Sequence, residues 1–266
     1  MIRFTKAHAY GNDFLYMLEA DVASTPLDRL AREMCDRHTG VGADGLIAYT
    51  PRPLGATMRL CNADGSVAEV SGNGVRALAA ILARQAGEGP LVLSIETAAG
   101  IKQLARLGRR GTQHLFRASM GVPVDLQRVR IDVSGETLDA VAMNMGNPQL
   151  IVLGPLPDDE RFTRLGAALE RHERFPDGTN IEFVHVETPT RLRIRIWERG
   201  CGPTQSSGTG SCASLVAAAA FGGAARDAEV TAPGGMQRVE WTPENVYLTG
   251  WAEVVCDGEW LRPLPA

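Results

Sequence analysis

The sequence predicts an α+β protein made of two pseudo-symmetric α/β domains, with a ligand site in the cleft between them. The main observation is a repeat: Ser-Gly-Asn-Gly at 71–74 returns as Ser-Gly-Thr-Gly at 207–210, 136 residues later (207 − 71), and an alanine-rich stretch follows each copy. The second observation is that each half mixes short runs rich in β-branched residues with helix-forming runs. A chain of 266 residues is long enough for two such domains.

Further landmarks recur in the same order at nearly the same spacing. The aligned pairs, at offsets of 136 or 135, are Asp44 with Asn180, Asn62 with Glu198, Gly11 with Gly146 and Gly100 with Gly235. We therefore predict an N-terminal half at 1–122, a C-terminal half at 123–256 and a C-terminal tail at 257–266.

Local patterns predict the elements of each half. In the first half, residues 27–37 follow Ser-Thr-Pro, which is typical of a helix start, and residues 75–84 are alanine-rich. The predicted strands there are 91–95 and 115–118. The glycine-rich run 40–45 has the spacing of a dinucleotide-binding turn, but a helix precedes it and an extended run follows, so we expect an ordinary loop.

The second half follows the same logic. Residues 212–220 are alanine-rich and end near two glycines, which predicts a helix. The runs 191–197 and 253–256 predict strands.

Composition narrows the class of partner. Lys plus Arg total 27 and Asp plus Glu total 31, a net charge of −4, which does not favour nucleic acid. The longest apolar run, 215–225, is too short to span a membrane. The five cysteines are scattered and form no Cys-x-x-Cys pair, so we expect reduced thiols in a cytoplasmic protein, and the five histidines lack the spacing of metal ligands. A small-molecule partner is the best expectation.

The two glycine-rich turns are candidate anion sites. Each precedes a predicted helix, so free backbone N–H groups and the positive end of the helix dipole would point out of the turn. The alternative is that serine only caps the helix and glycine only permits the turn. The recurrence of the motif in both halves favours the site.

Polar residues beside these turns could hold a zwitterion. Amide and carboxylate oxygens suit an ammonium group, whereas amide N–H groups and a guanidinium suit a carboxylate. The alternative is a turn role for each asparagine and a surface ion pair for the charged residues. The predicted substrate-binding residues, including those of the turns, are Asn12, Asn62, Gly72, Asn73, Asn147, Asn180, Glu198, Arg199, Gly208 and Thr209.

These motifs together resemble the diaminopimelate epimerases. The first half has Phe-x-Lys-x-His-x-x-Gly-Asn-Asp-Phe at 4–14, Gly-Ala-Asp-Gly at 42–45, Asn-Ala-Asp-Gly-Ser at 62–66 and Gly-Asn-Gly-x-Arg at 72–76. The second half has Met-Gly-Asn-Pro at 145–148, Gly-Thr-Asn-Ile-Glu-Phe at 178–183 and Trp-Glu-Arg-Gly at 197–200. The resemblance covers essentially the whole chain and implies the family's two-domain fold.

The resemblance also implies an activity. In this family two cysteines, one from each half, flank the substrate's α-carbon, where one removes a proton and the other returns one on the opposite face. The matching catalytic positions here are Ser71 and Ser207. The family implies no cofactor, an amino-acid-like substrate and a homodimer.

The chain departs from the family at these positions. A hydroxyl is a much weaker acid than a thiol and needs help to act as a base. Gln149 also stands where the family has histidine. Three interpretations follow: a divergent isomerase acting at the α-carbon of an amino-acid-like substrate, an epimerase whose cysteines were replaced in the laboratory, and an inactive amino-acid-binding protein.

Overall fold

The computed structural model describes residues 2–68, 70–87 and 89–263. Contacts between residues divide the chain into two units, Met1–Ala118 with Gly250–Ala266, and Ser119–Thr249. Each unit has its own run of paired strands, its own helices and its own apolar core.

The strands of the first unit close into a ring. Pairing runs from β1 through β2, β3, β4, β6, β7 and β8 to β17, and β17 also pairs with β1. The ring strands are β1 Ile2–Ala9, β2 Asn12–Leu18, β3 Gly45–Arg52, β4 Gly55–Asn62, β6 Leu91–Thr97, β7 Gly100–Arg110, β8 Gln113–Gly121 and β17 Val246–Trp260. The remaining elements are β5 Val67–Ala68, α1 Glu19–Val22, α2 Leu27–Cys35 and α3 Gly72–Gln85.

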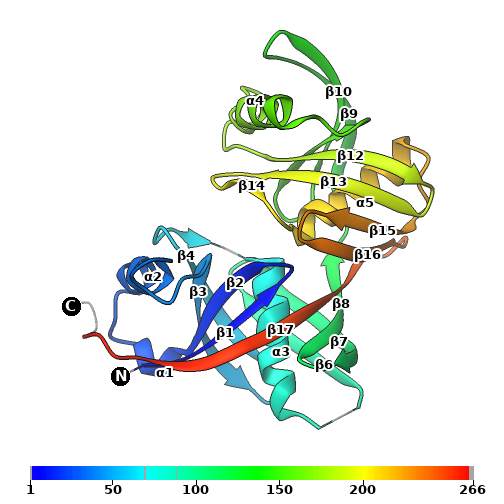
Figure 1. Ribbon diagram of the computed structural model, residues 1–266. Coiled ribbons are helices and arrows are strands. Elements are labelled where there is room, and N and C mark those ends of the chain that lie inside the picture. Colours follow the sequence, from blue (N-terminus) through cyan, green and yellow to red (C-terminus); the bar gives the residue numbers. More distant parts are fainter. Residues whose placement is uncertain (1, 69, 88, 264–266) are drawn as a thin grey trace. The chain divides into compact units, whose positions relative to one another are not determined.

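Helix α3 runs inside this ring. It contacts β1, β2, β6 and β7, and Figure 1 shows it in cyan among these strands. Its alanines favour a helix and let strands approach closely, and Ala77, Ala79 and Ala80 are fully buried. Because α3 is enclosed, its first turn is held at a fixed place relative to β1 and β2.

The second unit surrounds another apolar helix. Helix α5 (Gly208–Phe221) contacts β10, β11, β12, β13, β15 and β16, and its residues from Gly210 to Ala218 are buried on every side. A helix that is apolar all round belongs in a core. The strands are β9 Val124–Val133, β10 Glu136–Asn144, β11 Pro148–Leu153, β12 Asn180–Thr188, β13 Arg191–Glu198, β14 Gly202–Thr204, β15 Asp227–Ala232 and β16 Gly235–Trp241, and the second helix is α4 Asp159–Glu170.

The two units repeat one pattern of strand pairing. In the first unit β1–β2 is antiparallel, β2–β3 parallel, β3–β4 antiparallel and β4–β6 parallel. In the second, β10–β11, β11–β12, β12–β13 and β13–β15 follow the same order of directions. The central helix follows the short strand β5 in one unit and β14 in the other. The predicted α+β class and internal repeat are therefore confirmed.

The division by contacts differs from the sequence boundaries at the C-terminal end. The segment 253–260 lies in β17 and pairs with β1, from His8 opposite Glu253 to Ile2 opposite Trp260. Backbone hydrogen bonds of this ladder tie it to the first unit, whereas the sequence analysis placed it partly in the second half and partly in a tail. Residues 264–266 of that tail lie outside the described residues.

All predicted helices and strands are present, most of them with longer bounds. Helix α3 begins at Gly72 and α5 at Gly208, because a serine caps each first turn. The loop prediction for 40–45 is confirmed up to Asp44, after which β3 begins. Helices α1 and α4, most strands of both units and the β1–β2 hairpin were not predicted. In this hairpin Tyr10 and Gly11 turn with positive φ values of 55° and 84°.

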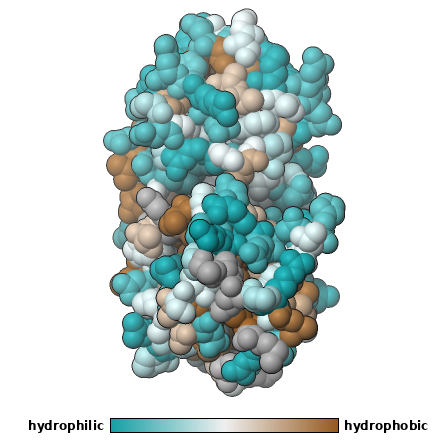
Figure 2. Space-filling view, turned by 90° about the vertical axis from the view of Figure 1, so that its left-hand side faces the viewer, coloured by the Kyte–Doolittle hydropathy of each residue, from teal (hydrophilic) through white to brown (hydrophobic). Residues whose placement is uncertain are grey.

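The face drawn in Figure 2 is largely polar. Hydrophilic residues there surround small separate hydrophobic patches. Three cysteines are buried, whereas Cys201 and Cys256 are exposed. Among the described residues, no helix combines the length and the hydropathy that a membrane span requires.

Candidate active site

The first half-site is built on the start of α3. Ser71 has extended backbone angles (φ −125°, ψ 121°) and caps the helix, because its Oγ accepts a hydrogen bond from Gly74 N at 3.1 Å. Tyr16 on β2 donates its hydroxyl to Gly74 O at 2.8 Å and so ties the first turn to the sheet. The positive end of α3 is therefore fixed at the Ser71 side chain.

A buried cation lies one turn further along α3. The Arg76 side chain is 1% exposed, donates to Asn73 Oδ1 at 3.1 Å and lies 5.8 Å from the centre of the Tyr10 ring. A buried guanidinium adds to the helix dipole, so this end of α3 favours negative charge.

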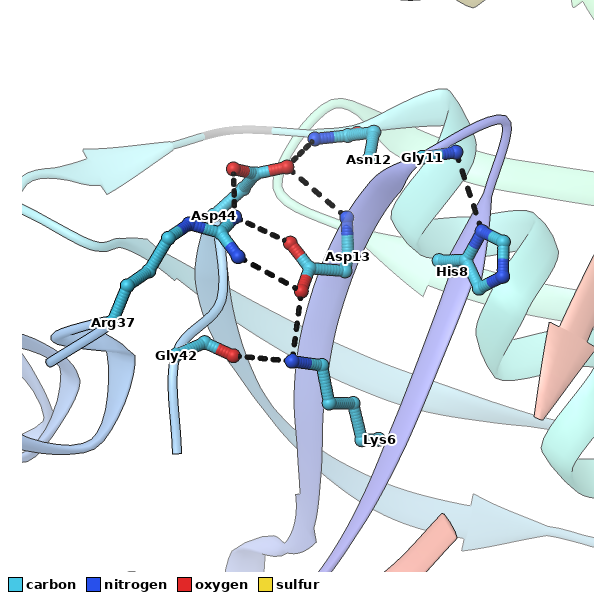
Figure 3. A network of polar contacts seen from close by, with 8 residues as sticks. All are labelled: Lys6, His8, Gly11, Asn12, Asp13, Arg37, Gly42 and Asp44. Atoms are coloured by element: carbon cyan, nitrogen blue, oxygen red, sulfur yellow. Dashed lines mark hydrogen bonds and ion pairs between the residues drawn. The ribbon is translucent and has the colours of Figure 1, made fainter. Parts of the chain in front are cut away.

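Asn12 is held by a network of charged residues (Figure 3). Its Nδ2 donates to Asp44 Oδ2 at 2.7 Å, and Arg37 joins Asp44 to Asp13 with contacts of 2.8 and 2.7 Å. Lys6 approaches Asp13 to 3.0 Å. Burial raises the pKa of Asp13, but its bonds to Arg37 and Lys6 outweigh burial and hold the pKa below its ordinary value. The network orients the Asn12 amide, because Asp44 can only accept from its nitrogen.

Asn62 lies at the same edge of the first unit as Asn12. Gly45 is opposite Asn62 in the β3–β4 ladder, and Ala63 N donates to Asp44 O at 3.0 Å. The Asn62 Nδ2 donates to Ser66 Oγ at 3.0 Å. The Asn12 side chain and the backbone next to Asn62 thus both contact Asp44.

His8 has a local structural role. Its Nδ1 accepts a hydrogen bond from Gly11 N at 3.2 Å, and its ring packs edge-on against Trp251. These contacts hold the turn of the β1–β2 hairpin.

The second half-site repeats the serine cap at the start of α5. Ser207 Oγ accepts from Gly210 N at 3.2 Å, close to the value at Ser71. Ser207 is 4% exposed, and its Oγ lies 3.5 Å from the hydroxyl of Thr209. The serine cap is therefore common to both halves.

Gln149 links this turn to the strands. It is fully buried on β11, and one end of its carboxamide is 2.7 Å from Asn147 Oδ1 and 3.2 Å from Thr209 Oγ1. The other end is 3.0 Å from both carboxyl oxygens of Glu182 on β12. Gln149 thus joins Asn147 and Thr209, which the sequence placed in one site.

Glu182 is a buried carboxyl beneath α5. It is 0% exposed, and burial, followed by the nearby charge of Glu198, raises its pKa well above the ordinary value. A Cβ added to Gly210 would lie 2.3 Å from Glu182 Oε1, so only glycine fits there. The sequence analysis did not single out Glu182, although a charged residue inside the apolar run 181–184 was a usable signal.

Asn180 and Arg199 hold each other in place at the strand ends. The Asn180 amide donates to Pro148 O at 2.9 Å and accepts from Arg199 N at 3.0 Å. The Arg199 guanidinium is exposed and donates to Asp177 O at 3.2 Å. Glu198 is half-buried beside it. The Asn180 side chain therefore positions the backbone on which Glu198 and Arg199 lie.

Most predicted site residues gather in two groups, one in each unit. In the first unit, Asn12 and the backbone next to Asn62 both contact Asp44, and Ser71, Gly72 and Asn73 form the first turn of α3. In the second unit, hydrogen bonds connect Asn147 with Thr209 and Asn180 with Arg199. Among the described residues, no group of three or more acidic, histidine or cysteine side chains is placed to hold a metal ion.

Comparison with known proteins identifies the family. The family model of diaminopimelate epimerase matches residues 4–124 and 141–255. This chain belongs to the diaminopimelate epimerase family. A diaminopimelate epimerase of Desulforudis audaxviator (strain MP104C) is 41% identical over 280 residues, which cover 98% of this chain and 100% of the relative. One from Desulfitobacterium hafniense is 39% identical and covers 97% of both chains. The family resemblance inferred from the motifs is confirmed.

Solved structures of epimerases share the fold. A predicted epimerase from Pseudomonas aeruginosa has a TM-score of 0.74 at 16% identity and covers 99% of this chain and 100% of that chain. A hydroxyproline epimerase from Agrobacterium vitis, with bound trans-4-hydroxy-L-proline, has a TM-score of 0.72 at 17% identity and covers 97% and 91%. These likenesses confirm the diaminopimelate epimerase fold predicted for the chain.

Proposed function

We propose that this member of the diaminopimelate epimerase family is a cofactor-independent isomerase acting at the α-carbon of an amino-acid-like substrate. Ser71 and Ser207 are the two groups that exchange protons with that carbon. Diaminopimelate is the first candidate substrate, because it is the one named for relatives at 39–41% identity. The chain is a divergent member, since both serines stand where the family resemblance implies cysteine.

The observation that carries the proposal is the duplicated serine cap. In each unit the serine Oγ accepts a backbone N–H at the positive end of an enclosed helix. Such N–H groups and helix ends stabilise negative charge, whether on a serine oxygen or on the substrate. Removing a proton from an α-carbon creates negative charge, so the same feature serves both the base and the carbanion.

Nearby groups supply the binding chemistry. The Asn12 amide, oriented by Asp44, presents its Oδ1 as an acceptor for an ammonium group. Arg76 at the base of the Ser71 turn favours a carboxylate. Glu198 and Arg199 offer one charge of each sign for a zwitterion.

The decisive experiment is proton exchange with solvent. The protein is incubated in D₂O with LL- and meso-diaminopimelate and with a panel of other amino acids. A substrate is expected to gain deuterium at its α-carbon, measured by NMR and by mass. Ser71→Ala and Ser207→Ala should each abolish the exchange, whereas Ser94→Ala, an exposed serine on β6, should leave it unchanged.

A second candidate function is amino-acid binding without chemistry. It is favoured by the serine caps themselves, because a hydroxyl that already serves a helix end is a weak base. Calorimetric binding of an amino acid without deuterium exchange would support this candidate and overturn the isomerase. Neither binding nor exchange over the whole panel would overturn both.

The double variant Ser71→Cys with Ser207→Cys separates the remaining interpretations. If the serines replaced cysteines in an ordinary epimerase, this variant is expected to gain turnover of LL-diaminopimelate. If the chain is a divergent isomerase, the wild-type protein has its own substrate and the double variant gains little on diaminopimelate.

A further inference from the structure

We propose that Glu182 is a positioning residue for Ser207: its carboxyl group, acting through the Gln149 amide, sets the direction of the hydrogen bond between Thr209 and Ser207. This inference rests on the proposed function, because it gives Ser207 a part in proton exchange. It concerns four side chains in one unit, Glu182, Gln149, Thr209 and Ser207.

The contacts form a continuous chain. Both Glu182 oxygens lie 3.0 Å from one end of the Gln149 carboxamide, and the other end lies 3.2 Å from Thr209 Oγ1. Thr209 Oγ1 is 3.5 Å from Ser207 Oγ, a long contact that a small side-chain rotation shortens. An amide has a donor end and an acceptor end. Its orientation therefore decides which neighbour accepts a hydrogen bond from Gln149 and which neighbour donates one to it.

When Glu182 is neutral, the chain has one consistent arrangement. The carboxyl O–H donates to Gln149 Oε1, and Gln149 Nε2 donates to Asn147 Oδ1 and to Thr209 Oγ1. Thr209 then has its own hydroxyl proton available for Ser207 Oγ. With Gly210 N–H donating as well, Ser207 Oγ receives two hydrogen bonds, which lowers the pKa of its hydroxyl.

When Glu182 is ionised, the chain reverses. The Asn147 amide turns together with that of Gln149, because two carboxamide oxygens 2.7 Å apart would repel each other. The Gln149 amide then has its nitrogen donating to both Glu182 oxygens. Its Oε1 then accepts the Thr209 hydroxyl proton, and Thr209 in turn accepts the proton of Ser207. Ser207 is held as a hydrogen-bond donor and is a poorer base. No proton passes through the amide, whose turn only reverses the direction of the hydrogen bonds.

The surroundings of Glu182 favour the neutral form. It is fully buried, and Glu198 on β13 faces it with a like charge. On the α5 side of β12, β11 (Pro148–Leu153) has no titratable residue, and the first turn of α5 consists of Gly, Thr and Gly. Helix α4, which carries Arg161 and Arg164, packs on β12 through the neighbouring residues Ile181 and Phe183. The α5 N–H of Gly210 serves Ser207 Oγ instead of Glu182.

The test compares Glu182→Gln with the wild-type protein over a range of pH. The variant keeps an N–H donor toward Gln149 and cannot ionise. Below the Glu182 midpoint, the two proteins should exchange the α-proton at rates within about twofold of each other. Above the midpoint, the ratio of the wild-type rate to the Glu182→Gln rate should fall about tenfold per pH unit, as the neutral fraction of Glu182 falls. Glu187→Gln, on the exposed part of β12, is the matched control and should keep the wild-type profile.

A second readout does not depend on turnover. Infrared difference spectra of protein with labelled glutamate should show a protonated carboxyl at neutral pH that is missing in Glu182→Gln. In ¹H–¹⁵N spectra, the Gly210 amide, which donates to Ser207 Oγ, should shift at the pH where that carboxyl ionises, and this shift should be lost in Gln149→Leu.

The outcomes separate the inference from the proposed function. One outcome is that no amino acid exchanges its α-proton, while the Gly210 amide shifts at the pH where the Glu182 carboxyl ionises. The isomerase proposal then fails, but the effect of Glu182 on the hydrogen bond between Thr209 and Ser207 is supported. If Glu182 is ionised at neutral pH, or if Gly210 shifts equally in Gln149→Leu, the inference is overturned whatever the protein catalyses. An unchanged pH profile in Glu182→Gln overturns its effect on Ser207.

Discussion

The two half-sites share one backbone plan and differ in the charges beneath it. Each serine Oγ accepts the N–H three residues later, at 3.1 Å for Ser71 and 3.2 Å for Ser207. One turn into α3 lies the buried cation Arg76, whereas the aligned position in α5 (76 + 136) is the buried Cys212. Beneath α5 lies the buried carboxyl of Glu182.

This difference shows which parts of a duplicated site are set by the backbone. Capping and helix dipoles are properties of the main chain, so both copies retain them. The charge beside each helix is a property of single side chains and has diverged. The Ser71 end is therefore suited to negative charge, whereas the Ser207 end depends on whether Glu182 is neutral.

The largest effect of a single substitution at a fixed pH is expected from removal of the cation of the first half-site. Arg76→Met leaves the buried Asn73 without its guanidinium bond and removes packing against Tyr10. We expect the free energy of unfolding to fall by about 2–3 kcal/mol, measured by urea denaturation. Cys212→Ala, the aligned change in α5, should lower the free energy of unfolding by less. An equal or larger loss in Cys212→Ala would show that Arg76 stabilises the protein only by filling space in the core.

The second prediction concerns pH and the second half-site. The folded-state pKa of Glu182 is raised, so the folded protein binds more protons than the unfolded chain above the ordinary Glu range. The contribution of Glu182 to the free energy of unfolding is therefore complete below the ordinary Glu range. It is lost as pH rises, by up to about 1.4 kcal/mol per pH unit, until the pKa of Glu182 in the folded protein is reached. Glu182→Gln should remove this loss of stability, measured by denaturation at several values between about pH 5 and pH 8. A wild-type curve that rises there as steeply as in the variant would contradict the prediction.

The third prediction tests the equality of the two caps. Ser71→Ala and Ser207→Ala should each lower the free energy of unfolding by about 1 kcal/mol, because each leaves one helix N–H without its side-chain acceptor. Thermal unfolding with each substitution alone and both together should give additive losses. A much larger loss at one serine would show that the two helix starts are not equivalent.

The smallest effect is expected from the charged network around Asn12. Arg37 bridges Asp13 and Asp44 but is about half exposed, so Arg37→Gln should cost only about 0.5 kcal/mol. The difference from wild type should shrink further in 1 M salt, a concentration at which charges on exposed groups are strongly screened. A loss that is insensitive to salt would point to a packing role for Arg37.

Much of this architecture could be predicted from the repeat. The turns at 71–74 and 207–210 led to the two central helices, and the aligned asparagines led to residues that the structure places at strand ends. Local composition was sufficient here, because capping and alanine content act within a few residues. Asn12 and Asn62 were predicted as site residues, but nothing in the sequence placed them side by side.

Other features depend on contacts distant in the chain. Residues 253–260 have a strand-like sequence, but nothing local indicates that their partner is β1 at the other end of the chain. Glu182 was missed for a similar reason. Its importance comes from Gln149 and Gly210, which surround it only after β11, β12 and α5 have packed. Long-range strand pairing and the burial of a single charge produce no clear local pattern in the sequence.

The ladder between β1 and β17 also has a consequence for synthesis. The second unit is a continuous segment, 119–249, and can fold as soon as that segment has left the ribosome. The first unit needs the pairing of Ile2 with Trp260 and cannot close its ring until almost the whole chain is made. The part of the protein that is synthesised first is thus the part completed last, and until then the edge of β1 that β17 will cover is open to other partners.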